Sequence, residues 1–116
     1  MVQPWYLCSD IDYTSLEIGS QWIWESLKGK YRMLKFSGDT DGAVPTKGTL
    51  RWIESLNRPV LEDWRPFFVN DELAGSVKEW EGLTLGTIHG AGHMAPQFKP
   101  PQTYHLIFQW LKQQPI

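Results

Sequence analysis

One stretch near the end of the chain, Leu83–Pro96, constrains the fold most strongly. Its first part, Leu83–Ile88, is apolar and β-branched and predicts a strand. Gly90–Gly92 follows, whose small residues allow a sharp turn, and His93 comes directly after it. Enzymes of the α/β class present a general base on such a loop at the end of a strand. The alternative is a loop histidine with a hydrogen bond and no chemistry, which is the commoner case for a single histidine.

A second junction between a strand and a loop lies upstream. Tyr31–Ser37 has apolar residues on both faces, which is typical of a strand inside a covered sheet, and it runs into Gly38–Pro45. This loop is rich in turn formers and carries Asp39 and Asp41. The carboxyl ends of strands are where open α/β sheets place ligands and catalytic groups. The alternative is that either aspartate only shapes the turn, by accepting backbone N–H bonds.

The remaining sequence predicts further helices and strands. We expect helices at Ser15–Lys28, at Thr46–Asn57 (N-cap Thr46; buried face Leu50, Ile53 and Leu56) and after Pro100 and Pro101 (buried face Tyr104, Ile107, Phe108 and Leu111). We expect a loop at Arg58–Pro66, a short strand at Phe67–Val69, and a hairpin formed by Ala74–Trp80 and Leu83–Ile88. The predicted class is α/β, with strand–loop–helix units and a mostly parallel sheet that has a hairpin before the histidine loop.

Length and charge exclude several classes of function. The 116 residues suffice for one domain, and the net charge of -2, with no run of Lys or Arg, argues against nucleic-acid binding. The apolar stretches are too short to span a membrane, and the first residues do not read as a signal peptide. His89, His93 and Cys8 lack metal-ligand spacing, so we expect no metal and no cofactor. His89 is expected to be a strand residue and His105 a residue of the helix surface.

Tryptophan and cysteine are unusual in number. Seven Trp in 116 residues must be buried or form a sticky surface. A non-catalytic aromatic binding module, for carbohydrate for example, predicts these rings on an exposed flat face, whereas an enzyme fold predicts that most are packed. The single cysteine, Cys8, cannot form an internal disulfide. Composition favours a small buried hydrophobe there, while in a secreted protein an odd cysteine implies a partner elsewhere.

The order of the two loops points to one kind of catalytic site. An aspartate followed by a histidine, each on a strand-end loop, is the order that closes an α/β-hydrolase triad. In such a triad the carboxylate bonds one ring nitrogen, and the other nitrogen takes the proton of a serine hydroxyl. That serine should lie on a G-x-S-x-G elbow, a pattern that Ser20, Ser37 and Ser76 all lack. Two of the three parts are therefore present.

These motifs resemble those of a known family. Phe36–Pro45 is similar to the aspartate motif of the serine carboxypeptidases, and Gly90–Pro96 is similar to their histidine motif. Trp64–Phe67 and Ala74–Thr84 resemble the connecting hairpin region of that family, and Trp5–Asp10 resembles the segment that opens its last third. The resemblance covers essentially the whole chain.

The resemblance implies an α/β-hydrolase fold, with residues 1–116 as the C-terminal portion, and release of C-terminal residues from peptides at acidic pH. Asp41 then matches the catalytic aspartate and His93 the catalytic histidine, while Asp39 is left as a turn former. Met94 matches a residue that lines the pocket for the leaving amino acid. Cys8 matches a cysteine that is disulfide-bonded to the first half of the protein in relatives.

Several parts of the family are not among the 116 residues: the nucleophile, the oxyanion-hole amides, the acidic groups that hold the substrate carboxylate, and the signal peptide. The resemblance therefore implies a C-terminal fragment, a truncated gene model or one chain of a two-chain enzyme, inactive without its N-terminal half or a companion chain. The tryptophans would cover part of the seam to that half. The full-length protein is expected to be secreted or vacuolar/lysosomal. Acyltransferase and hydroxynitrile lyase activities, which relatives have, and an inactive fragment stay open, as does the oligomeric state.

Overall fold

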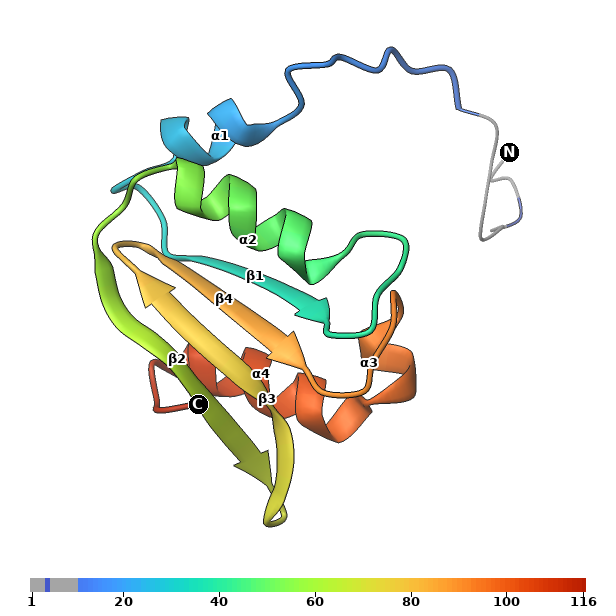
Figure 1. Ribbon diagram of the computed structural model, residues 1–116, viewed down its shortest axis with the longest axis vertical. Coiled ribbons are helices and arrows are strands. Elements are labelled where there is room, and N and C mark those ends of the chain that lie inside the picture. Colours follow the sequence, from blue (N-terminus) through green and yellow to red (C-terminus); the bar gives the residue numbers. More distant parts are fainter. Residues whose placement is uncertain (1–3, 5–10) are drawn as a thin grey trace.

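The computed structural model describes residue 4 and residues 11–116. Trp5–Asp10, including Cys8, therefore lies outside the described residues. The predictions made for that segment, including the one for Cys8, also lie outside them. The described elements are the helices α1 (Gln21–Ser26), α2 (Thr46–Ser55), α3 (Ala95–Phe98) and α4 (Pro100–Lys112), and the strands β1 (Met33–Gly38), β2 (Val60–Val69), β3 (Glu72–Trp80) and β4 (Leu83–Ile88) (Figure 1).

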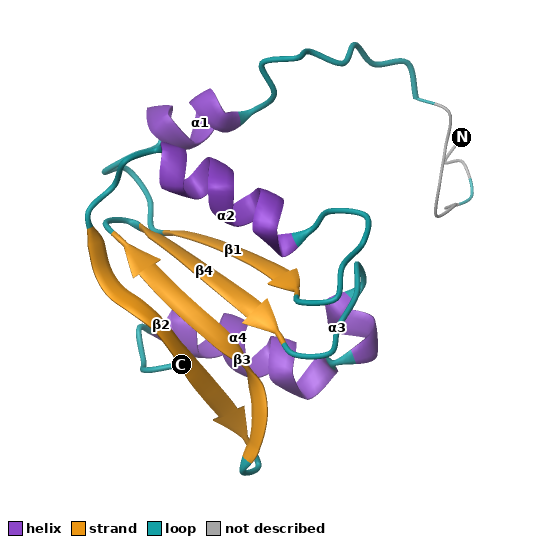
Figure 2. Ribbon diagram, viewed as in Figure 1, coloured by secondary structure: helices purple, strands orange, loops and turns teal. Residues whose placement is uncertain are grey.

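The four strands form one mixed sheet in the order β1-β4-β3-β2 (Figure 2). Only β1 and β4 run parallel, and the β4–β3 and β3–β2 pairs are antiparallel. The α/β class is confirmed, but the expectation of a mostly parallel sheet is wrong. The reason lies in the connections, because turns as short as Asn70-Asp71 and Glu81-Gly82 can join only antiparallel strands.

The sheet is covered on both faces, and each face has its own core. Alternation along β4 sends Leu83 and Leu85 to one face, where they pack with Ile53 of α2. It sends Ile88 to the other face, where it packs with Leu106 of α4. Helices α2 and α4 therefore lie on opposite sides of the sheet (Figure 1).

Two helix predictions are corrected at their N-terminal ends. The helix expected at Ser15–Lys28 is limited to α1, because Gly19 has a φ of +61° and Leu16, expected on its buried face, is 67% exposed. The residue at the N-cap of α2 is Pro45, and Thr46 is the first helical residue. The Thr46 hydroxyl instead contacts β1, where it lies 2.9 Å from the Ser37 hydroxyl and donates to the Gly38 carbonyl at 3.0 Å.

The buried face of α4 differs from the predicted one. Thr103 and Leu106 are buried, whereas Tyr104, Phe108 and Leu111 are exposed. Leu106 contacts the backbone of Gly86, where a Cβ would come within 2.6 Å of a Leu106 methyl group. The missing side chain of Gly86 thus admits Leu106 and sets the rotation of the helix, which apolar spacing alone could not reveal.

The expected loop at Arg58–Pro66 is wrong, since β2 begins at Val60 and includes Pro66 opposite Ser76. The short strand predicted at Phe67–Val69 is the last part of this longer strand. Pro66 is tolerated because β2 lies at the edge of the sheet, where a residue without an N–H group need not break a ladder between two neighbours.

The tryptophans are distributed over several elements. Trp80 is buried in the core beneath α2, and Trp24 and Trp52 pack against the same core with ring centroids 5.1 Å apart. Trp110 is half-buried, while Trp22 and Trp64 are 59% and 39% exposed. Most of the described tryptophans therefore contribute to packing. Within the described part of the chain, no helix has both the length and the apolar character needed to cross a membrane.

Candidate active site

The site lies where the parallel strands β1 and β4 end side by side. Their last registered pair is Gly38 and Ile88, and the Asp39 N–H then donates to the Ile88 carbonyl at 3.1 Å. A Cβ on Gly38 would lie 2.2 Å from the carbonyl oxygen of Ala91. Glycine at this position thus permits the two strand-end loops to lie in contact.

The first loop presents Asp41 in a local hydrogen-bonded turn. One carboxylate oxygen, Oδ1, accepts the backbone N–H groups of Ala43 at 2.8 Å and Val44 at 3.0 Å. The other oxygen, Oδ2, is directed at His93. The Val44 N–H first, and the His93 hydrogen bond second, hold the pKa of the Asp41 carboxyl below its ordinary value of 3.8, although partial desolvation opposes them. Asp41 is thus an ionised acceptor under mildly acidic and neutral conditions.

The second loop presents His93 to this carboxylate. Gly90 opens it with a φ of +65°, and Ala91 is buried in the core while its carbonyl accepts both the N–H of Thr40 at 3.0 Å and the Thr40 hydroxyl at 2.7 Å. His93 Nδ1 then lies 2.9 Å from Asp41 Oδ2. The His93 side chain is 61% exposed and that of Asp41 only 6%. The pair is therefore a shielded carboxylate under an accessible imidazole.

The hydrogen bond to Asp41 determines the chemistry that His93 can perform. An ionised carboxylate only accepts, so Nδ1 carries the proton and the lone pair of the neutral ring lies on Nε2. Nε2 makes no hydrogen bond to any of the residues that the structure describes. The arrangement can take up a proton at Nε2 and stabilise the resulting imidazolium through Asp41.

A hollow of about 420 Å³ opens beside the pair, along the free edge of β1. Its walls include Asp41, His93 and Pro96 together with residues of β1. A hollow of similar size, about 430 Å³, lies near Arg32 and Trp110, away from the two loops. We assign the site to the hollow beside β1, because it holds the imidazole–carboxylate pair.

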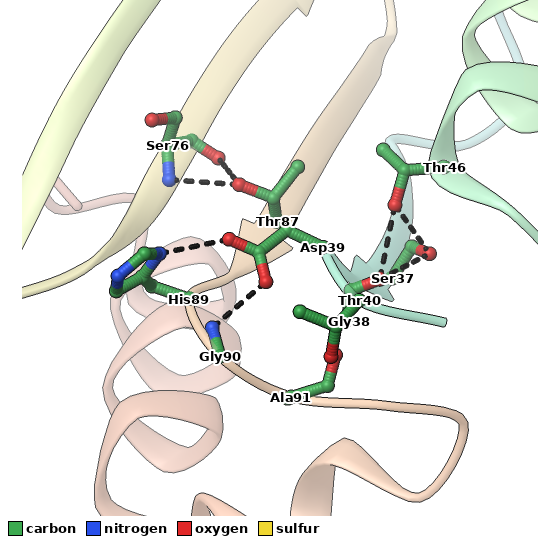
Figure 3. Close-up of polar contacts among 10 residues, drawn as sticks. All are labelled: Ser37, Gly38, Asp39, Thr40, Thr46, Ser76, Thr87, His89, Gly90 and Ala91. Atoms are coloured by element: carbon green, nitrogen blue, oxygen red, sulfur yellow. Dashed lines mark hydrogen bonds and ion pairs between the residues drawn. The ribbon is translucent and has the colours of Figure 1, made fainter. Parts of the chain in front are cut away.

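A second carboxylate–imidazole pair lies next to the first and was not expected from the sequence. Asp39 Oδ2 is 2.8 Å from His89 Nδ1, and Asp39 Oδ1 accepts the Gly90 N–H at 2.7 Å (Figure 3). Asp39 is thus more than a former of its own turn, and His89 follows β4 rather than lying in the strand. The sequence shows both residues near the ends of predicted strands, but the parallel pairing of β1 with β4 that brings them together is visible only in the structure.

The other predicted site residues are more dispersed. Met94 follows His93, is 40% exposed and stands at the N-cap of α3. The hydroxyl of Ser37 contacts Thr46 and Gly38. Among the described residues, no serine hydroxyl hydrogen-bonds His93, and no group of three or more His, Cys, Asp or Glu side chains could hold a metal ion.

His105 was expected on the surface of the last helix. It is half-buried, and its ring stacks on Phe67 with centroids 5.9 Å apart. This histidine packs against the sheet and lies apart from the imidazole–carboxylate pairs.

Comparison with known proteins places the chain in one family. A family model described as serine carboxypeptidase matches residues 2–113. Serine carboxypeptidase 1 of Hordeum vulgare is 38% identical over 113 residues, which cover 95% of this chain and 23% of the barley protein. Serine carboxypeptidase-like 17 of Arabidopsis thaliana is 44% identical over 92 residues, or 78% of this chain and 21% of that protein. The chain thus spans about a fifth of the length of these relatives.

Proposed function

The chain belongs to the serine carboxypeptidase family, and from this membership we propose that Asp41 and His93 are two members of the catalytic triad of a serine-type carboxypeptidase. The observation that carries the proposal is the 2.9 Å contact between Asp41 Oδ2 and His93 Nδ1 at the ends of neighbouring parallel strands. The fold is accordingly proposed to be part of an α/β-hydrolase, in which such strand ends carry the acid and the base.

In this proposal the nucleophile is a serine on a segment outside the 116 residues. His93 Nε2 takes the proton of that hydroxyl as the oxygen attacks the C-terminal peptide carbonyl, and the imidazolium is stabilised by Asp41. His93 then gives the proton to the leaving amino acid, whose C–N bond breaks, and an acyl-enzyme forms. Water, activated by the same nitrogen, releases the shortened peptide and restores the serine.

The position of β1 among the described strands supports an additional segment beside the site. Strand β1 is an edge strand whose free side borders the hollow that holds Asp41 and His93. The strand ladder can be extended there, and a segment added along this edge would lie beside the hollow that His93 lines. We propose that the N-terminal half of the enzyme, or a companion chain, occupies this edge.

The remaining assignments follow from family membership. Met94 is proposed to line the pocket for the leaving amino acid, which fits a side chain that is 40% exposed directly after His93. Cys8 is proposed to form a disulfide with a cysteine outside this chain, in a secreted or vacuolar/lysosomal protein. A mass shift of the Cys8-containing peptide on reduction would test the disulfide.

The experiment uses the whole enzyme that carries this chain, with an N-blocked dipeptide that has a free C-terminal carboxylate as substrate. His93→Ala should lower kcat by about a thousandfold or more, and Asp41→Asn by somewhat less, because the base is lost in one and its orientation in the other. Asp63→Asn, at an ion pair on the opposite edge of the sheet, is the control and should retain full activity. Unchanged hydrolysis in His93→Ala would refute the proposal.

A further inference from the structure

The pair formed by Asp39 and His89 has no part in the mechanism above. We propose that these two residues are positioning residues that hold the His93 loop against the Asp41 loop, so that His93 Nδ1 stays within hydrogen-bonding distance of Asp41 Oδ2. This inference rests on the proposed function, in which His93 is the base. Three observations support it: the position of the pair in the chain, the contacts of the Asp39 carboxylate, and the open surroundings of Gly92, directly before His93.

In the chain, the pair lies between the two parallel strands and the proposed catalytic residues. Gly38 of β1 and Ile88 of β4 are in register, and Asp39 and His89 are the next residues along the two parallel strands. Their side chains meet at 2.8 Å immediately beyond the last pair of the ladder. The proposed catalytic pair then follows a few residues further along the same loops. The Asp39–His89 contact is therefore a side-chain continuation of the ladder toward His93.

Both oxygens of Asp39 contact the opposite loop. Oδ2 lies 2.8 Å from His89 Nδ1, and Oδ1 accepts the Gly90 N–H at 2.7 Å. Gly90 has a φ of +65°, so this bond fixes the peptide at the point where the chain turns out of β4. A carboxylate that engages two successive residues restrains both the direction and the twist of the turn.

Contacts with the rest of the fold are few at one residue between this turn and His93. The Ala91 carbonyl accepts two hydrogen bonds from Thr40. At Gly92, by contrast, a Cβ would meet no heavy atom within 4 Å. The buried Ala95 anchors the chain after His93, and the anchors that precede Gly92, two of which Asp39 supplies, set the direction from which the chain enters His93.

Because the Asp39–His89 pair is exposed, its effect on the position of His93 can be distinguished from an effect on the stability of the fold. The His89 side chain is 57% exposed and that of Asp39 33% exposed. Exposed side-chain pairs of this kind contribute little to the free energy of unfolding. Loss of the pair should therefore alter the geometry of His93 far more than the stability of the fold.

The kinetic test compares variants of the whole enzyme on the same blocked dipeptide. Asp39→Asn and His89→Ala should each lower kcat about tenfold with KM changed less than twofold, because small misplacements of a catalytic group lower the rate steeply. The double variant should lose no more than either single variant, since one contact is removed. His89→Asn, whose amide N–H can replace Nδ1–H, should recover most of the activity. Unchanged kcat in both single variants, or additive losses, would overturn the proposal.

Asp63→Asn is the matched control. Asp63 also contacts a basic side chain and a backbone N–H, with Lys78 Nζ at 2.9 Å and the Trp64 N–H at 2.8 Å from the same oxygen, Oδ1, but it lies on β2 at the opposite edge of the sheet and holds no second loop. Its kcat should equal that of the wild type. An equal loss of kcat in this variant would show a general effect of removing a surface carboxylate, and would count against positioning.

A second readout is independent of catalysis. The ring ¹⁵N shifts of His93, identified by their loss in His93→Gln, report which nitrogen carries the proton. The neutral ring should be mainly the Nδ1–H tautomer in the wild type and a mixture of tautomers in Asp39→Asn. An unchanged tautomer in that variant would refute positioning. If His93→Ala leaves hydrolysis intact, the proposed function fails, and the tautomer measurement still decides whether Asp39 orients His93.

Discussion

Replacement of Gly38 by alanine tests the close approach of the two loops. An alanine Cβ would lie 2.2 Å from the Ala91 carbonyl oxygen and 2.4 Å from that of Gly92. Carbon and oxygen atoms approach no closer than about 3.3 Å without strain, so the loops must move apart by about 1 Å. The three nearest atoms to this Cβ belong to the backbone, which cannot yield as the end of a flexible side chain can.

Two consequences of this movement can be estimated. Forcing an extra methyl group into a packed site costs about 1–3 kcal/mol of stability, and the two hydrogen bonds from Thr40 to the Ala91 carbonyl are weakened. A displacement of about 1 Å between His93 and Asp41 lowers kcat by about a hundredfold. Gly38→Ala should therefore lose activity out of proportion to its loss of stability.

Urea unfolding and steady-state hydrolysis by the whole enzyme measure the two effects. Gly48→Ala is the control, because a Cβ there meets nothing within 4 Å on an exposed helical position. It should raise stability by up to about 1 kcal/mol and leave kcat unchanged. A Gly38→Ala enzyme with wild-type stability and wild-type kcat would refute the argument that glycine is needed for this contact.

Three further predictions concern stability. The pKa of Asp41 is lowered from 3.8, so its ionisation stabilises the fold above pH 3.8 and this contribution is lost as the pH falls through the lower folded-state value. The unfolding free energies of the wild type and Asp41→Asn, measured in urea, should therefore converge below pH 3.8; a constant gap would contradict the assignment. Leu106→Ala should cost about 2–5 kcal/mol, because the side chain is fully buried. Gly86→Ala should be destabilising in the wild type and much less so in Leu106→Ala, since its Cβ conflicts only with Leu106; equal costs in both backgrounds would exclude that contact.

Residue patterns within single elements predicted much of the fold. Alternation and apolar runs located β1, β3 and β4, and the spacing of Leu50, Ile53 and Leu56 located α2. Edge position was not visible in the sequence, so Pro66 was interpreted as a boundary when it lies inside β2. The prediction of a mostly parallel sheet was wrong because the relative direction of two strands depends on the length of the turn that joins them, and not on the sequences of the strands.

The candidate site could likewise be predicted only in part. The resemblance to a family pointed to Asp41 and His93, which the structure brings within 2.9 Å; their catalytic role stays a proposal. The contact between Asp39 and His89 was missed because it depends on the register of β1 with β4. The register between two strands that are far apart in the chain produces no periodic pattern in the sequence of either strand.

The parallel pairing of β1 with β4 has a consequence for the order of folding. The pairs β2–β3 and β3–β4 are joined by short turns and can form locally, whereas β1 must meet a strand about fifty residues further along the chain. Closing such a long loop costs more entropy than closing a hairpin, so this pairing comes late. Asp41 follows β1 and His93 follows β4, so these two residues meet only when the two strands pair. Their contact therefore reports that this last pairing has formed. In a chain that stops folding before that step, Asp41 and His93 are both present but are not in contact.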